Sequence, residues 1–222
     1  PLAERTLGCP VEMEFAVDRN EEGKLRLCPV QMRPMAIPKG ASKISPVELQ
    51  EHGVLVASEN AMGHGFKSDI EDIVYLKPGA FDIGKSHAIA LEVQEFNNSF
   101  LNGKTPYVLI GFGRWGSSDR WLGIPVNWGQ VSGASVIVEA PFLNLNPDPS
   151  QGAHFFHNLI SFGVFYFYVR DKGNSRVNWE WLEKQKAKRE GTYLRHVRLD
   201  QPLSIRADGL AGLGVIKLGD RV

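Results

Sequence analysis

The stretch from Tyr107 to Trp121 constrains the fold more than any other part of the chain. Its first six residues, Tyr-Val-Leu-Ile-Gly-Phe, form an apolar run, and a loop rich in glycine, serine and arginine follows. A short apolar run with this ending predicts a buried strand that delivers a polar loop to the edge of a sheet. We expect the neighbouring segments to cover that strand in an α/β or α+β fold, with a mixed central sheet flanked by helices.

Composition places the chain among globular proteins. It has 222 residues, 43% of them hydrophobic, which is enough for one large or two small domains. Lysine plus arginine equals aspartate plus glutamate at 25 each, so the net charge indicates neither a nucleic-acid partner nor a membrane surface. Cys9 and Cys28 are too few for a disulfide framework and lack metal-ligand spacing, which favours reduced thiols in a cytoplasmic protein.

The apolar runs and the first residues of a chain can reveal membrane-spanning segments and signal peptides. No apolar run approaches the ~20 residues that a membrane span requires, and the start Pro-Leu-Ala-Glu-Arg does not resemble a signal peptide. Because the chain begins with proline and enters a strand pattern almost at once, we expect it to be a piece of a longer protein.

The first 35 residues predict a β-hairpin. Residues 11–17 alternate between polar and apolar, a polar turn follows, and residues 24–32 return. The return strand changes phase beside Pro29, where a β-bulge would restore its apolar residues to one face. The other face would then carry four polar side chains: Glu12, Glu14, Gln31 and Arg33.

This polar face suits a nucleotide phosphate. Carboxylate and amide oxygens are hard ligands for Mg²⁺, and a guanidinium can bind phosphate oxygens in a fork. The alternative is a solvated hairpin face without a ligand.

The same segment resembles a known family. Glu-Met-Glu-Phe-Ala-Val, a short gap and Leu-Cys-Pro-Val-Gln-Met-Arg-Pro resemble the closing hairpin of the ATP-grasp domain in phosphoenolpyruvate synthases and pyruvate phosphate dikinases. The resemblance implies that Glu14 and Gln31 contact the nucleotide and its magnesium, and that Arg33 contacts the phosphates during transfer. It implies ATP and Mg²⁺ as cofactors and a small-molecule phosphate acceptor. The upstream lysine, arginine and glycine-rich loop of the family lie outside this sequence, so the remainder of the ATP-grasp domain would be a partner.

Two domains follow from this interpretation. Residues 1–38 would form the terminal hairpin and its connector, and residues 39–222 an α/β domain. The segment Gly111 to Phe162 resembles the C-terminal region of large bacterial dikinase-like proteins, for which the resemblance implies no assigned chemistry. The phosphoenolpyruvate-binding barrel of the ordinary family is not in this sequence.

A phosphate-carrier histidine is a further hypothesis. Lys85-Ser-His87-Ala resembles the carrier motif of the same family, which lies at a helix start where the N-terminus stabilises phosphate. The alternative is a surface histidine on an amphipathic helix from Lys85 to Leu101. We expect four residues to supply much of that helix's apolar face: Ala88, Leu91, Val93 and Phe96.

The loop from Gly111 to Asp119 offers a second candidate site. Its glycine spacing imitates a dinucleotide fingerprint, but no helix or acidic ribose partner follows in the sequence. Its N–H groups and side chains could instead bind a phosphate or carboxylate, in a cleft lined by five residues: Arg114, Ser117, Ser118, Gln151 and His154. The alternative is a tight structural loop anchored by Trp115 and Trp121.

Other segments complete the expected fold. Ser45-Pro-Val-Glu48 predicts a short helix with a capping box, and Asn178 predicts the cap of a charged helix from Trp179 to Arg189. A helix is also expected from His154 to Phe162, where two histidines lack a third zinc ligand at suitable spacing. Strands are expected at residues 54–58, 70–76, 133–139, 164–169, 193–199, 203–206 and 214–218, with a loop at Gly63-His64-Gly65. The strand at residues 164–169 is β-branched and aromatic, so we expect it at the centre of the sheet.

Two functions therefore compete. The first is an incomplete part of an ATP-dependent phosphotransferase of the dikinase type. The second is a non-catalytic anion-sensing or interaction module built around the Gly111–Asp119 loop.

Overall fold

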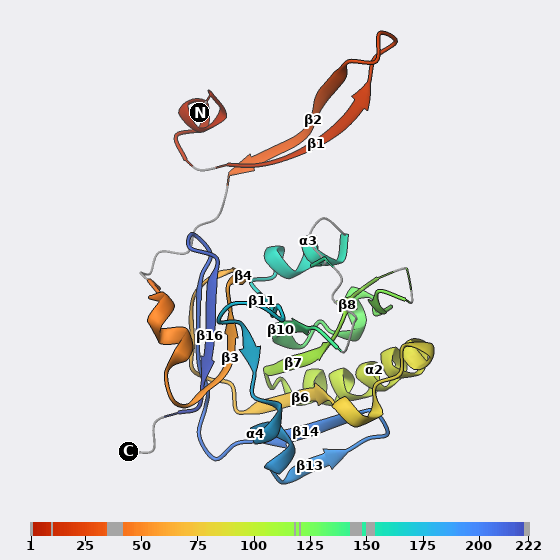
Figure 1. The fold of residues 1–222 in the computed structure, drawn as a ribbon, viewed down its shortest axis with the longest axis vertical. Coiled ribbons are helices and arrows are strands. Elements are labelled where there is room, and N and C mark those ends of the chain that lie inside the picture. Colours follow the sequence, from red (N-terminus) through yellow and green to blue (C-terminus); the bar gives the residue numbers. More distant parts are fainter. Residues whose placement is uncertain are drawn as a thin grey trace. The chain divides into compact units, whose positions relative to one another are not determined.

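The computed structural model describes residues 2–9, 11–34, 42–117, 119, 121–142, 148–149 and 154–219. The chain divides into two compact units, Pro1–Lys39 and Gly40–Val222 (Figure 1). The first unit holds α1 (Leu2–Leu7) and an antiparallel hairpin, and the second holds the remaining strands and helices.

The hairpin of the first unit pairs β1 (Val11–Arg19) with β2 (Leu25–Pro34). Its turn is closed by the side chain of Asn20, which accepts hydrogen bonds from the backbone N–H groups of Glu22 (3.1 Å) and Lys24 (2.9 Å). Gly23 has φ 77°, a left-handed conformation that glycine adopts without steric penalty. The predicted hairpin is confirmed.

The second unit is built on a mixed seven-stranded sheet. Its middle strands β6, β7, β10 and β11 are parallel, whereas β13, β14 and β4 run antiparallel to their neighbours at the edges. The spatial order is β13 (Ala187–Glu190), β14 (Leu194–Arg198), β6 (Asp72–Leu76), β7 (Tyr107–Phe112), β10 (Ala134–Ala140), β11 (Phe165–Tyr168) and β4 (Asn60–Met62). The strand that opens the Tyr107–Trp121 stretch lies at the centre of this sheet with every residue buried, as its apolar sequence predicts.

Helix α2 (Ser86–Gly103) connects β6 to β7 and covers one face of this sheet (Figure 1). Phe100 stacks on Tyr107 with ring centroids 4.4 Å apart, and Ile89, Val93 and Phe96 are buried with it. The helix lies within two residues of its expected bounds, but its expected apolar face was partly wrong. Ala88 is exposed and Leu91 is 63% exposed, because the buried stripe is rotated toward Ile89 and Phe100.

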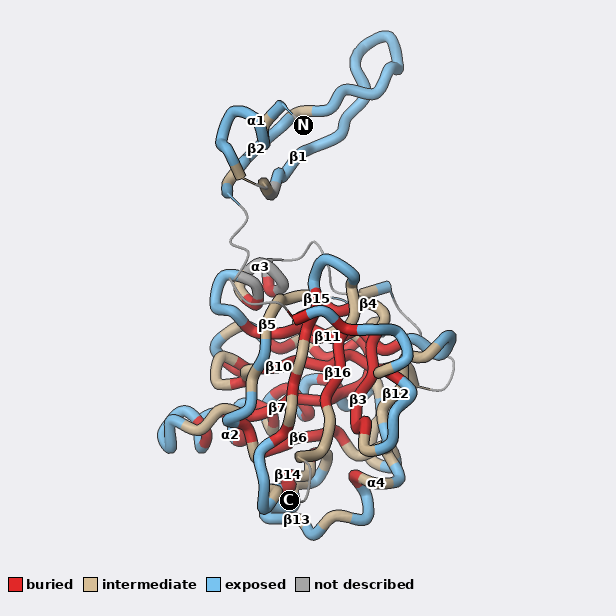
Figure 2. Tube along the Cα trace, turned by 90° about the vertical axis from the view of Figure 1, so that its left-hand side faces the viewer, coloured by how far each residue is buried: buried red, intermediate tan, exposed pale blue. Residues whose placement is uncertain are grey.

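A five-stranded antiparallel sheet covers the opposite face. It contains β12 (Arg176–Val177), β3 (Val54–Ser58), β16 (Leu213–Lys217), β15 (Ser204–Asp208) and β5 (His64–Lys67). Contact between the two sheets is close at Gly214, where an added Cβ would lie 2.6 Å from the ring of Phe167. The buried core residues therefore come from both sheets and from α2, and Figure 2 colours the strands of both sheets largely as buried.

A short 3₁₀ helix, η1 (Pro46–Gln50), covers the outer face of the five-stranded sheet and buries Leu49 against Val54 and Val215. The backbone N–H of Ser45 donates to the Glu48 carboxylate (2.9 Å), which is one half of the predicted capping box.

Three smaller expectations were wrong. The charged helix expected from Trp179 to Arg189 ends earlier, as α4 (Trp179–Lys184), and residues 187–190 form β13 instead. The Asn178 side chain caps this helix as predicted. Of the loop expected at Gly63-His64-Gly65, His64 and Gly65 belong to β5, and Gly63 alone separates β5 from β4. Val164–Val169 contributes β11, which is buried but lies next to the edge strand rather than at the sheet centre.

The remaining elements connect the strands. They are η2 (Pro78–Ala80), η3 (Ile83–Lys85), β8 (Arg114–Trp115), β9 (Gly123–Ile124), η4 (Trp128–Gln130) and α3 (His154–Ser161). No helix in the described part of the chain combines the length and apolar character needed to span a membrane.

Candidate functional site

The hairpin carries the first group of predicted site residues on one face. Glu14 lies directly opposite Gln31, and Arg33 lies opposite the backbone of Glu12. The pairing shifts between Glu14 and Phe15, where the partners are Gln31 and Pro29. Val30 is therefore the extra residue of a β-bulge beside Pro29, as the phase change predicts. If Val30 instead paired regularly with Glu14, Gln31 and Arg33 would project from the opposite face, because side chains alternate along a strand.

The geometry of Glu14 and Gln31 suits a magnesium ion in part. Side chains directly opposite each other in an antiparallel pair have Cβ atoms ~5 Å apart, so both oxygen donors can reach one cation. Within the described residues no group of three or more histidine, cysteine, aspartate or glutamate side chains could hold a metal. The other ligands would then be phosphate oxygens and water, which Mg²⁺ commonly retains.

The second face of the hairpin is apolar and open to solvent. Met13 and Met32 pair across the strands, and Val17 pairs with Leu27. These side chains, together with Phe15, are between 42% and 58% exposed, and the hairpin is drawn largely as exposed in Figure 2.

An ion pair closes the polar face near the turn. The Arg26 guanidinium donates to both carboxylate oxygens of Asp18, at 2.9 Å and 2.5 Å. The hydrogen bond to Asp18 raises the pKa of Arg26, so this arginine holds its proton and neutralises the neighbouring carboxylate.

The glycine-rich loop at the end of β7 is anchored in the core by Trp115. The indole is 1% exposed and its Nε1 donates to the carbonyl oxygen of Val138 at 3.1 Å. Gly111 makes room for it, since an added Cβ there would lie 2.2 Å from the indole. Trp121, by contrast, is 58% exposed, so its expected role as a second anchor was wrong.

Two loop residues of the predicted anion site already have protein partners. The Arg114 Nε donates to the carbonyl oxygen of Asp148 at 2.5 Å. The Ser117 hydroxyl donates to the carbonyl oxygen of Asp119 and accepts from its N–H, at 2.8 Å and 3.2 Å. Arg114 is thus brought to the segment after β10, whereas Ser117 is engaged in a local turn.

The other members of that predicted site are only partly placed. Ser118 and Gln151 lie outside the described residues. His154 is the first residue of α3, and its side chain also lies outside the described part.

Sequence reasoning missed three polar residues near Arg114. They are Glu139, Tyr168 and Arg170. Glu139 lies near the carboxyl end of β10 and pairs with Tyr168 on β11, and Arg170 follows shortly after Tyr168 in the chain. Burial raises the pKa of Tyr168 despite the positive charges of Arg170 and Arg114, and the Arg170 guanidinium lies 5.8 Å from the ring centroid of Tyr168. The available signal was positional, because the carboxyl ends of adjacent parallel strands meet at one edge.

His87, the predicted phosphate carrier, is the second residue of α2 and is exposed. The turn that leads into the helix already holds a carboxylate, since Asp82 accepts a hydrogen bond of 2.8 Å from the N–H of Gly84. That negative charge weakens the attraction of this helix start for phosphate.

Comparison with known proteins supplies no relative: no protein-family model, no curated protein and no solved structure matches the chain.

Proposed function

We propose that the hairpin supplies nucleotide-binding residues to an ATP- and Mg²⁺-dependent phosphotransferase of the dikinase type, and that this chain is inactive alone. The observation that supports it is the bulge at Val30, which sets Glu14 opposite Gln31 and keeps Arg33 on the same face. A β-bulge changes the direction of the side chains that follow it and interrupts the regular pairing, and such bulges are common next to functional sites.

Each residue has a role that follows from its chemistry. Glu14 and Gln31 supply oxygen donors to the nucleotide-bound magnesium ion. Arg33 supplies a planar fork for phosphate oxygens and offsets the charge that spreads over them during transfer to a small-molecule acceptor. Catalysis of this kind depends on positioning and electrostatics, because phosphoryl transfer demands little covalent chemistry from the protein.

The apolar face of the hairpin supports the need for a partner. A two-stranded hairpin is marginally stable by itself, and three or more strands or a packed face are usually required. The exposed row of Met13, Phe15, Val17, Leu27 and Met32 would pack against the remainder of the ATP-grasp domain.

Calorimetry with Mg²⁺-ATP tests the proposal. The chain alone should bind weakly, and a longer natural protein that includes the upstream domain should bind tightly. In the longer protein, Arg33→Ala should weaken binding by about tenfold or more, which corresponds to loss of one charge-assisted contact. Arg19→Ala is the matched control, because it removes the same charge from the other face of the hairpin.

Deletion of Val30 provides a geometric test in the same protein. It should leave binding tight, because Gln31 then follows Pro29 directly and still lies opposite Glu14, with Arg33 opposite Glu12, whereas Arg33→Ala weakens binding in the same protein. Tight binding by the chain alone that is insensitive to Arg33→Ala would refute the nucleotide assignment.

A second candidate is an anion-sensing or interaction module around the Gly111–Asp119 loop. It is favoured by the gathering of Arg114 and Arg170 near Tyr168 at the carboxyl ends of parallel strands, where open α/β sheets bind ligands. If Arg114→Ala leaves both anion binding and the turnover of the longer protein unchanged, the loop is architectural.

A further inference from the structure

A separate charged cavity lies where β6 ends beside β14. Its volume is about 360 Å³, at the lower end of the ~300–1,000 Å³ that small-molecule sites occupy. Lys77 follows directly after β6 and its N–H donates to the carbonyl oxygen of Tyr193 at 2.9 Å. The cavity is therefore held at the carboxyl end of a parallel strand that pairs with an antiparallel strand from much later in the chain.

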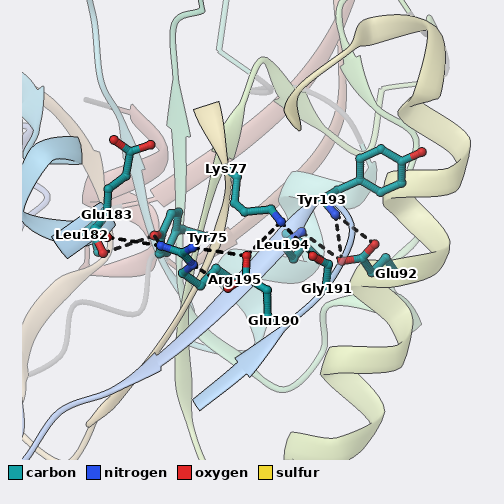
Figure 3. A network of polar contacts seen from close by, with 10 residues as sticks. All are labelled: Tyr75, Lys77, Glu92, Leu182, Glu183, Glu190, Gly191, Tyr193, Leu194 and Arg195. Atoms are coloured by element: carbon teal, nitrogen blue, oxygen red, sulfur yellow. Dashed lines mark hydrogen bonds and ion pairs between the residues drawn. The ribbon is translucent and has the colours of Figure 1, made fainter. Parts of the chain in front are cut away.

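Two cations in this cavity share one carboxylate (Figure 3). The Lys77 ammonium donates to Oε1 of Glu190 at 2.9 Å. The Arg195 guanidinium donates through Nε to Oε2 at 2.6 Å and through Nη2 to Oε1 at 3.3 Å. Both cationic groups thus lie within hydrogen-bonding distance of the same oxygen, and only one negative charge separates them.

The surrounding backbone fixes both cations in place. Lys77 also donates to the carbonyl oxygen of Gly191 at 2.8 Å. Arg195 Nη1 donates to the carbonyl oxygen of Glu183 at 3.2 Å and to the Tyr75 hydroxyl at 3.4 Å. Tyr75 is fully buried and its hydroxyl donates to the carbonyl oxygen of Leu182 at 3.2 Å. Burial raises the pKa of Tyr75, so the hydroxyl remains a neutral donor at physiological pH.

Donor capacity remains after these contacts. Among the hydrogen bonds of the described residues, two of the three ammonium N–H groups of Lys77 are used. Arg195 uses Nε–H, one Nη2–H and both Nη1–H groups, which leaves one Nη2–H. The side chains of Lys77 and Arg195 are 22% and 25% exposed, so both can be reached from solvent.

The charge in the cavity selects the kind of anion. Hydrogen bonds from Arg195 and then Lys77 lower the pKa of Glu190, so it is ionised at neutral pH and leaves the pair of cations with one net positive charge. Glu183 also lines the cavity, and in Figure 3 its carboxylate points away from the guanidinium. Lys77, Arg195 and Glu190 together carry one net positive charge, which suits a monoanion, and Glu183 brings the sum over the four groups to zero. Repulsion by the two carboxylates is about twice as large for a phosphate dianion as for a monoanion.

We propose that this cavity binds a small monocarboxylic acid, whose carboxylate bridges Lys77 Nζ and Arg195 Nη2 beside Glu190. Glu183, at a greater distance from the two cations, adds a repulsion that weakens the binding of phosphate. The site belongs to the second unit and is independent of the nucleotide proposal.

The test is a titration of the ¹⁵N-labelled chain with acetate, L-lactate and inorganic phosphate at pH 7, followed by the amide resonances of Gly79 and Gly191. Acetate and L-lactate should shift these resonances saturably, and phosphate should bind at least about tenfold more weakly. Lys77→Met should weaken carboxylate binding about tenfold or more. Lys184→Met, which removes the same charge from exposed α4, should leave it unchanged.

Glu183→Gln gives the sharpest outcome, because its carboxylate makes no hydrogen bond among those of the described residues. It should narrow the preference for carboxylate over phosphate by about tenfold, since one repulsive charge is removed. The proposal is overturned if neither carboxylate shifts the resonances, if phosphate binds more tightly than acetate in the unmodified chain, or if Lys77→Met and Lys184→Met behave alike. Arg195→Lys is a control for misfolding, because it keeps the positive charge and removes only the planar donor fork. It should weaken binding without changing the far-ultraviolet circular dichroism spectrum.

Discussion

Glu139 and Trp115 are joined by a buried hydrogen bond of 2.9 Å, from the backbone N–H of the tryptophan to Oε1 of the carboxylate. The second oxygen of Glu139 accepts a hydrogen bond of 2.5 Å from the hydroxyl of Tyr166. One side chain of β10 therefore ties the glycine-rich loop after β7 to the neighbouring strand β11.

Replacement of this carboxylate should loosen the loop. In Glu139→Gln, the amide NH₂ replaces one acceptor oxygen, so either the hydrogen bond from Trp115 N–H or the one from Tyr166 O–H is lost. We expect the free energy of unfolding to fall by about 1–3 kcal/mol, measured by urea denaturation. Tyr166→Phe is the companion variant, and a loss near zero in both would show that the carboxylate does not hold the loop.

The pairing of β8 with β9 requires glycine at position 123. A Cβ on Gly123 would lie 2.0 Å from the carbonyl oxygen of Arg114 and 2.4 Å from its nitrogen, and backbone atoms cannot move aside as a flexible side chain does. Gly123→Ala should lower the free energy of unfolding by about 3 kcal/mol. Gly79→Ala, where an added Cβ meets nothing within 4 Å, is the control and should change stability little. Equal stability of the two variants would contradict the close approach.

A buried ion network should make Asp72 important for stability. Its carboxylate is 1% exposed, lies 2.6 Å from Nε2 of His196 and accepts a hydrogen bond of 3.1 Å from Arg198. Asp72→Ala leaves two polar partners without their acceptor, and we expect a loss of about 3–5 kcal/mol in thermal or chemical unfolding. Asp200→Ala, at an exposed aspartate, is the matched control. A similar loss of unfolding free energy in both variants would show that the buried contacts of Asp72 do not account for its effect.

Glu48 should contribute to the acid sensitivity of the fold. Its pKa is lowered from 4.5, first by the hydrogen bond from the Ser45 N–H and then by Arg206. Because the folded pKa lies below the unfolded one, the stabilisation is complete at pH values above the unfolded pKa. It is lost as the pH falls from about 4.5 through the folded pKa.

The corresponding measurement is urea denaturation between pH 3 and 7 for the unmodified chain and Glu48→Gln. The variant should be less stable by about 1–3 kcal/mol at pH 7, and the difference should shrink below pH 4.5. The exposed Asp171→Asn is the control. A difference that stays constant over the whole range would exclude an ionised Glu48 as its source.

Local patterns in the sequence were sufficient for much of the fold. The alternation and phase change around Pro29 predicted a hairpin with a bulge, and the apolar run at Tyr107 predicted a buried strand. Both features depend on residues that are close together in the sequence, so a local pattern is enough to predict them.

Features that depend on distant partners were missed. Residues 187–190 have charges that suit a helix, but β13 pairs with β14, and Arg189 places its guanidinium 4.0 Å from the ring centroid of Phe96 on α2. Glu139 looked like the polar end of a strand, whereas its buried position depends on Trp115 and Tyr166 from other elements. The predicted nucleotide roles of Glu14, Gln31 and Arg33 stay predictions, because they concern a ligand and a partner segment rather than the fold.

The five-stranded sheet has a consequence for synthesis on the ribosome. Ser58 of β3 pairs with Gly214 of β16, so β3 emerges long before the strand that pairs with it. Until then the buried residues of β3 lack the neighbour that covers them, and such nascent intermediates are prone to aggregate and to recruit chaperones. A stop codon before Leu213 would therefore leave a gap between β3 and β15 in the five-stranded sheet, rather than shorten that sheet at its edge.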